Sequence, residues 1–350
     1  EFFSGPERLT AGAIFFYLVT QEVSGIPLLR SLAEIFLLLI ALYELSRGFP
    51  EWRKLVINPV YASALLFVAS ALFGCVISPL PEISFDELKT PLLKNMLLAP
   101  LLLSIAILGL LRHDWGAERI ARLLLISLAV SGLGQLIWVL TIYAQHFIAV
   151  GKLPADPFFH RYKVSAALVV FPFALLSLQS FSRLWNFLMK GVALGLLLVI
   201  LTSNARGAWL GLFASIGYIY LVNRKSVNAE FKFDRKTLLF TPVLLGLVLF
   251  LLNGTVMLDT FLAKVAQGFD TSQRMGHGTW GATFDLIMQK PWLGYGYGDA
   301  THTAAYNALA PNRPEWFFRE SVGAHNSILT HWVAAGIFGL FAILALYAGF

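Results

Sequence analysis

Residues 59–78 have the sequence PVYASALLFVASALFGCVIS, in which no side chain is charged. An α-helix rises about 1.5 Å per residue, so this stretch is long enough to cross the roughly 30 Å hydrocarbon core of a membrane. Similar apolar runs recur along the chain. A transmembrane β-barrel would instead show shorter strands of alternating hydrophobicity. The pattern therefore predicts an all-α polytopic membrane protein.

The composition supports the same class. Hydrophobic residues make up 57% of the 350 residues and charged residues only 13%, which would leave a soluble globule without a solvated surface. We expect about ten spanning helices, at residues 9–22, 27–46, 59–78, 92–111, 120–143, 164–182, 184–202, 207–222, 238–253 and 326–350.

A long polar insert separates the last two apolar runs. The sequence predicts a helix bundle over 1–252, an external insert over 253–325, and a final helix over 326–350. This helix is still apolar at Phe350, so we expect further helices beyond it and about 12 spans in all. Within the insert, the spacing of apolar residues predicts a short helix over 279–289 that ends before Pro291. The rest of the insert is expected to form short helices and loops.

The distribution of Lys and Arg predicts the orientation. Cationic residues stay preferentially on the cytoplasmic side, and one set of alternate loops holds about twice as many as the other. This bias places the N-terminus in the cytoplasm and the insert on the outer face. The net charge of +6 is explained by this topology, and no basic cluster indicates nucleic-acid binding.

Two arginines are candidates for binding an anion at the outer face. Arg206 lies in the short turn 202–207 between two apolar runs, where it could contact lipid phosphate or present its guanidinium to a bound phosphate. Arg274 lies in the polar stretch 270–278, where it could also be a solvated charge or a partner of Asp270.

His325 immediately precedes the last apolar run. An imidazole there could be the polar tip of an interfacial residue or a general base near neutral pH. We expect no metal and no cofactor, because His277, His302, His325 and His331 lack the spacing of metal ligands. The run Gly294–Gly298, GYGYG, follows no strand, so it predicts a flexible turn that lets backbone approach a ligand, and not a dinucleotide loop.

Several of these motifs together resemble the O-antigen ligase and polymerase superfamily. They are the Arg206 turn SNARG at 203–207, Arg274 with Trp280, KPWLGYG at 290–296, HNSIL at 325–329 and GIFGL at 336–340. The resemblance implies a bacterial inner-membrane glycosyltransferase of the multi-helix GT-C type, with its active site at the periplasmic face. Many members carry a Glu after the His-Asn-Ser element, where this chain has Ala334 or Ala335, so we assign that position no catalytic role.

The resemblance also implies substrates and residue roles. The donor is a glycan linked to undecaprenyl pyrophosphate, and in ligases the acceptor is lipid A-core. His325 would act as the base of an inverting transfer, with Arg206 and Arg274 binding the pyrophosphate without a metal. Further contacts to substrate are assigned, by location, to Arg161, Lys163, Lys89, Lys94 and Asn326.

Other functions share some of these features. An O-antigen polymerase or a protein O-oligosaccharyltransferase would have the same motifs and a different acceptor. An anion transporter would show charged or broken helices at mid-membrane and internal repeats, whereas the charges here lie at helix ends. A structural membrane scaffold would give no reason for arginines and a histidine to share one face.

Overall fold

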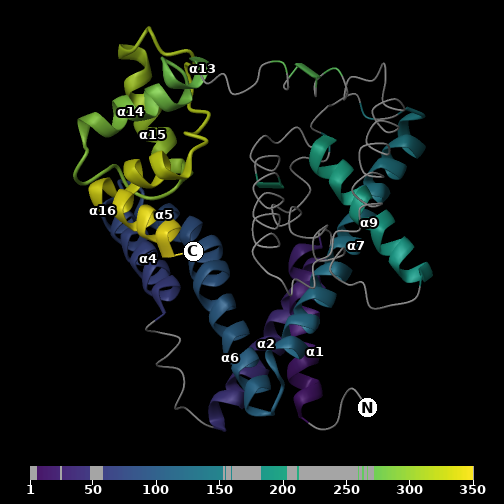
Figure 1. Ribbon diagram of the computed structural model, residues 1–350. Helices are drawn as coiled ribbons and strands as arrows, with labels where there is room; N and C mark the ends of the chain where they lie inside the picture. Colours follow the sequence, from purple (N-terminus) through teal and green to yellow (C-terminus); the bar gives the residue numbers. More distant parts are fainter. Residues whose placement is uncertain are drawn as a thin grey trace, which may run out of the picture. The chain divides into compact units, whose positions relative to one another are not determined.

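The computed structural model describes residues 6–23, 26–47, 58–152, 183–202 and 272–349, with a few isolated positions between them. Every regular element in these ranges is a helix (Figure 1). Contacts divide the chain into two compact units. The first unit comprises Glu1–Leu42 and Ala106–Gly268, and the second comprises Tyr43–Ile105 and Phe269–Phe350.

The first unit is built from long helices. They are α1 (Glu7–Glu22), most of α2 (Pro27–Ser46), α7 (Ala117–Val150) and α9 (Arg183–Thr202). Helix α7 packs against both α1 and α9. Ala129, Leu196 and Ile200 lie in the apolar core around α7 and α9. These small and branched side chains let the helices approach closely where water is excluded.

The second unit contains a long helical run and a tightly packed helix pair. The run consists of α5 (Pro81–Leu88), a π-helix (Lys89–Leu98) and α6 (Ala99–Arg112), the last of which continues beyond the unit. The pair consists of α4 (Pro59–Ile77) and α16 (Ser327–Gly349). Their interface buries Phe67, Ala71 and Cys75 of α4 against Ala342 and Ile343 of α16.

The described part of the polar insert folds around a small core of its own. Its helices are α13 (Ser272–Met275), α14 (Thr279–Gln289), α15 (Asp299–Leu309) and the 3-10 turn Ala310–Asn312. Trp316 is 1% exposed and packs with Leu286 and Tyr306. The indole of Trp316 donates a hydrogen bond of 2.9 Å to Asp285. Packing of this kind fixes the insert without a cross-link.

Helix α16 is broken near its middle, and the insert fills the break. Ala335 and Gly336 have non-helical dihedrals, with φ of +58° at Gly336. The break separates the carbonyl of Val333 from the N–H of Ile337, which would be partners in a continuous helix. Instead, Val333 accepts from the N–H of Tyr295 at 2.7 Å, and Ile337 donates to the carbonyl of Trp292 at 3.3 Å. The loop thus restores the backbone hydrogen bonds that the break removes.

Glycines allow the backbone of the loop 290–298 to approach the backbone of α16. A Cβ at Gly336 would lie 2.1 Å from the carbonyl oxygen of Trp292, and a Cβ at Gly294 would lie 2.5 Å from that of Val333. Both glycines also have positive φ, a conformation that costs other residues energy. The GYGYG run therefore forms a turn, and the close backbone approach that was predicted toward a ligand is instead made to α16 within the fold.

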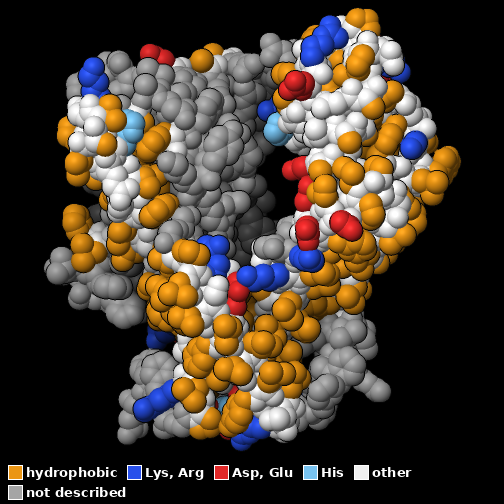
Figure 2. Space-filling view, turned by 180° about the vertical axis from the view of Figure 1, so that it is seen from behind, with side chains coloured by type: hydrophobic (Ala, Val, Ile, Leu, Met, Phe, Trp, Pro, Cys, Tyr) orange, Lys and Arg blue, Asp and Glu red, His pale blue; other side chains and the backbone are white. Residues whose placement is uncertain are grey.

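Four helical stretches of the described chain are long and apolar enough to span a membrane: Pro59–Ile77, Pro81–Arg112, Ala117–Val150 and Ser327–Gly349. Large hydrophobic side chains are exposed on the helices, including Val76 at 71% and Phe341 at 63%. On the face drawn in Figure 2, such side chains gather over the helices. An apolar surface of this extent is suited to lipid. The chain is a multi-pass helical membrane protein.

The predicted helices agree with the structure at several positions and differ at others. The helices predicted over 9–22, 27–46, 59–78, 184–202 and 279–289 are confirmed to within two residues. The helix predicted over 92–111 instead begins at Pro81, because Pro81 suits a first helical position and the polar segment after it remains helical. The helix predicted over 120–143 extends over Ala117–Val150.

The last predicted helix, 326–350, is interrupted at Ala335 and Gly336, which hydropathy alone does not reveal. The helices predicted over 164–182, 207–222 and 238–253 lie outside the described residues, apart from the helical positions 211 and 212.

Candidate active site

His325 is exposed and lies directly before the first turn of α16. Its φ is +49°, a left-handed conformation that only one other non-glycine residue of the described chain, Asp114, adopts. Such a backbone costs free energy and is found where the surrounding structure holds a side chain in a defined position, often at functional sites. Here the preceding residue, Ala324, is buried at 3% exposure. The chain therefore fixes His325 while leaving its imidazole open to solvent.

Asn326 caps the helix that follows His325. Its side-chain oxygen accepts hydrogen bonds from the N–H groups of Ile328 and Leu329, at 3.0 and 3.2 Å. The hydroxyl of Thr330 donates to the Asn326 carbonyl at 2.9 Å. These bonds satisfy N–H groups that a helix start leaves unpaired. Asn326 was assigned to substrate, and the structure gives its side-chain oxygen a helix-capping role.

Arg274 is exposed at the end of α13. Its guanidinium lies over the ring of Trp280, 5.8 Å from the centroid, in a cation–π contact that fixes its direction without using its hydrogen-bond donors. No hydrogen bond or ring contact joins Arg274 to His325 within the described chain.

The structure describes only some of the other cationic residues that were predicted to contact substrate. Lys89 is exposed and pairs with Asp86 one turn earlier on the same helix. Lys94 is half-buried within the π-helix Lys89–Leu98. Arg161, Lys163 and Arg206 lie outside the described residues, so their assignment to pyrophosphate remains a prediction.

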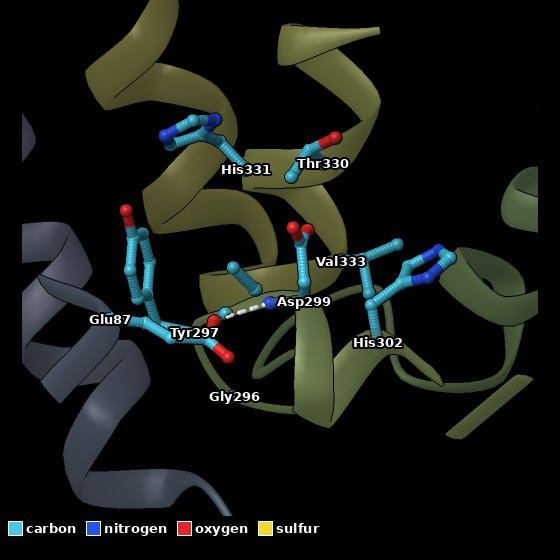
Figure 3. A pocket seen from close by; sticks show the side chains of 10 residues that line it. Glu87, Gly296, Tyr297, Asp299, His302, Thr330, His331 and Val333 are labelled. Atoms are coloured by element: carbon cyan, nitrogen blue, oxygen red, sulfur yellow. Dashed lines mark hydrogen bonds between the residues drawn. The ribbon is translucent and has the colours of Figure 1, made fainter. Parts of the chain in front are cut away.

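A cavity of about 400 Å³ opens in the second unit beside the first turns of α16 (Figure 3). Four segments line it: α5, the turn leading into α15, α15 itself, and α16. Its lining residues are Glu87, Gly296, Tyr297, Gly298, Asp299, His302, Thr330, His331, Val333 and Ala334.

Glu87 ties α5 to the start of α15. One of its carboxylate oxygens accepts from the backbone N–H of Asp299 at 2.6 Å (Figure 3), and the other accepts from the backbone N–H of Ala300 at 3.3 Å. The carboxylate therefore caps a helix from a segment more than two hundred residues away, and it also suits the positive end of the helix dipole. Gly298 makes room for it, since a Cβ there would lie 2.2 Å from the Glu87 oxygen.

Burial keeps two further groups of the cavity uncharged. It raises the pKa of Tyr297 to about 12, helped by the nearby acidic groups Cys75, Glu87 and Asp299. Burial also lowers the pKa of His302 below its usual 6.5, and the charge of Asp299 opposes this only in part. Near neutral pH the phenol of Tyr297 and the imidazole of His302 are therefore uncharged.

Glu87, Asp299 and Tyr297 were not predicted as site residues from the sequence. They come from separate elements, and only the docking of the GYGYG turn against α4 and α16 brings them together. The turn itself was the available signal, because glycines at alternate positions indicate a close backbone approach. Among the residues that the structure describes, no three His, Cys, Asp or Glu side chains are grouped as metal ligands.

The helices and their apolar surface define a multi-pass membrane protein with a polar cavity beside the first turns of one helix. Residues 191–344, which include Arg206, Arg274 and His325, match the family model described as O-antigen ligase. The chain is also 29% identical over 341 residues to an O-antigen ligase of Salmonella typhimurium (strain LT2), covering 95% of this chain and 80% of that relative. These matches confirm the resemblance seen in the motifs. No solved structure matches the chain.

Proposed function

We propose that the chain is an inverting O-antigen ligase. It would transfer O-antigen polysaccharide from undecaprenyl pyrophosphate to lipid A-core at the periplasmic face of the bacterial inner membrane. The family match over 191–344 and the similarity to the Salmonella ligase support this class of reaction. The observation that carries the proposal is His325, an exposed imidazole held in a left-handed backbone conformation before a capped helix.

In the proposed reaction, a neutral His325 takes the proton of an acceptor hydroxyl. The acceptor oxygen forms a bond to the anomeric carbon of the donor sugar from the side opposite the pyrophosphate. The bond between that carbon and the pyrophosphate oxygen breaks, so the configuration inverts. Undecaprenyl pyrophosphate leaves with the electron pair, and the proton remains on His325 until solvent accepts it.

Arginines are proposed to stabilise the charge of the leaving pyrophosphate. The cation–π contact with Trp280 leaves the donors of Arg274 available for phosphate oxygens. Arg206 would supply the second guanidinium, with Arg161, Lys163, Lys89 or Lys94 as a third cation. With this much positive charge the reaction would need no metal.

The proposed architecture is a GT-C type bundle with about ten spans in this sequence, with 1–252 as the bundle, 253–325 as a periplasmic insert and 326–350 as a further span. The N-terminus would be cytoplasmic, as the distribution of Lys and Arg indicates.

The test is a transfer assay with purified protein, lipid-linked O-antigen and lipid A-core. The variant His325→Asn removes the imidazole and retains a residue type that tolerates positive φ. We expect its kcat to fall about 100-fold or more, as for loss of a general base. Arg274→Ala and Arg206→Ala should each lower kcat about 100-fold, as for loss of an oxyanion donor. A chelator should not change the rate of the wild type.

Matched variants control for nonspecific effects. His277→Asn changes an exposed residue of the same insert, and Arg313→Ala changes a partly exposed one that pairs with Glu315; both should retain wild-type rates. Transfer at a normal rate by His325→Asn would reject the mechanism. Replacing lipid A-core with a second lipid-linked glycan or an acceptor protein distinguishes a ligase from a polymerase and from a protein O-oligosaccharyltransferase.

A further inference from the structure

The cavity beside α16 has an unusual charge for a protein proposed to bind pyrophosphate. Among the residues that the structure describes, its lining includes the carboxylates of Glu87 and Asp299 and no Lys or Arg. Two negative charges at the wall would repel phosphate groups. The cavity therefore does not suit the charged part of the donor.

The carboxylate of Asp299 is available to a ligand. It projects from the first turn of α15 toward Thr330 (Figure 3), its residue is exposed, and it makes no side-chain hydrogen bond or ion pair within the described chain. Glu87, by contrast, is already bonded to backbone N–H groups. An ionised carboxylate only accepts hydrogen bonds, so a ligand of Asp299 must carry a hydrogen-bond donor such as a hydroxyl.

His302 supplies an independent indication of a ligand. It is only 6% exposed, and its Nδ1 lies 3.2 Å from the hydroxyl of Ser321. Its Nε2 is buried and has no hydrogen-bond partner among the described residues, although its ring lines the cavity. Buried polar atoms are nearly always paired, because an unpaired one costs free energy. A hydroxyl group in the cavity could pair with this nitrogen.

The remaining groups fit a sugar. Tyr297 offers a neutral phenol and an apolar ring face on the other side of Asp299 from His302 (Figure 3). The volume of about 400 Å³ falls within the range of small-molecule sites. Few, well-placed polar groups around an apolar surface are typical of such sites. We propose that this cavity binds an uncharged, hydroxyl-rich sugar ring through Asp299, His302 and Tyr297.

This inference rests on the proposed function, and it specifies which part of the substrate the protein recognises. Thr330 lies three residues into α16, about 4.5 Å of helical rise beyond Ser327, and His325 lies just before that helix. The cavity and the proposed base are therefore presented by the same helix end. A glycan with one ring in the cavity would place a neighbouring ring near His325. The bound ring could belong to the acceptor core or to the donor glycan.

Binding is measured by saturation-transfer NMR on the full chain in lipid nanodiscs. The probes are a core oligosaccharide without lipid that ends in a neutral hexose, and an O-antigen oligosaccharide without its carrier. All proteins carry His325→Asn, so that turnover is slow on the time scale of the measurement. We expect transfer to one probe, which identifies the source of the ring, and its loss when Asp299→Asn or Tyr297→Phe is added. Glu320→Gln, an exposed carboxylate of the same insert, should leave the signal unchanged.

Kinetics provide the second measurement. In the active protein, Asp299→Asn should raise the KM for the same substrate about tenfold and leave kcat within about threefold, as for one charged hydrogen bond. Oligosaccharide binding that does not depend on Asp299 or Tyr297, or an unchanged KM, would overturn the cavity proposal. Normal transfer by His325→Asn would instead overturn the proposed function, so the two failures are distinguishable.

Discussion

Helices α7 and α16 cross comparable apolar environments in different ways. Helix α7 continues through 34 residues, from Ala117 to Val150, and ends at Gly151 with a left-handed φ of +72°. Helix α16 is interrupted after about two turns, and the loop 290–298 fills the interruption with its own hydrogen bonds. The described polar cavity lies beside the interrupted helix.

The difference shows what a site within a helical membrane protein requires. A continuous helix satisfies its own backbone and presents only side chains, whereas a broken one exposes polar groups that hydrocarbon cannot satisfy. In α16 a glycine-rich loop satisfies them and also brings Tyr297 and Asp299 to the cavity. The same loop thus satisfies the backbone hydrogen bonds and places polar side chains at the cavity.

The largest effect should follow from closing the interruption. Gly336→Val would place side-chain atoms where the carbonyl of Trp292 lies and would impose positive φ on a β-branched residue. We expect a loss of about 3 kcal/mol or more in the free energy of unfolding, together with loss of transfer activity. Thermal unfolding in nanodiscs measures the change.

Gly191→Ala in the continuous helix α9 is the control, because a Cβ there meets nothing within 4 Å. It should be neutral or stabilising by up to about 1 kcal/mol. Equal tolerance at both glycines would show that the loop does not depend on a close approach at Gly336.

A smaller effect should come from the helix start at Asn326. Asn326→Ala removes the cap and should cost about 1 kcal/mol of stability, with a loss of activity because His325 is no longer held. Asn326→Asp retains the cap and should restore stability. Asn58→Ala, at the similarly capped start of α4, should cost a similar amount of stability and leave activity unchanged. If Asn326→Asp is stable and inactive, the side-chain amide of Asn326 contacts substrate directly in the wild type.

The smallest effect should be a pH dependence of stability due to His302. Burial lowers its pKa in the folded protein below the usual 6.5, so the unfolded chain binds a proton more readily. The stability contributed by this group is therefore fully present above pH 6.5 and decreases as the pH falls toward the lowered value. Unfolding temperatures measured between pH 7.5 and 5 should show this decrease, and His302→Gln should reduce it. If His302→Gln leaves the pH dependence of stability unchanged, other groups cause it.

Hydropathy predicted the helices well where the chain is apolar and continuous. The boundaries of α2 and α14 were predicted to the residue, because Pro27 and Pro291 mark a helix start and a helix end in the sequence. Hydropathy did not predict the interruption of α16, since Ala335 and Gly336 are as apolar as their neighbours.

The candidate site was predicted only in part for a related reason. His325 and Arg274 could be named from their positions at the edges of polar segments, and both are exposed. Glu87 could not, since its role is to cap a helix that begins at Asp299, and no local pattern connects two residues so far apart. Contacts that depend on the tertiary fold leave little trace in local sequence.

The π-helical segment after α5 constrains how the length of the chain can vary. In it, the N–H of Ala99 bonds to the carbonyl of Lys94, five residues earlier, so the segment accommodates more residues per turn than an α-helix. Deleting one residue between 89 and 98, with the winding of the remaining turns kept, would rotate α5 by about 100° about its axis. Glu87 would then face away from Gly298, and α15 would lose its anchor. Insertions and deletions should accordingly be rarer in this segment than in the exposed turns of the insert.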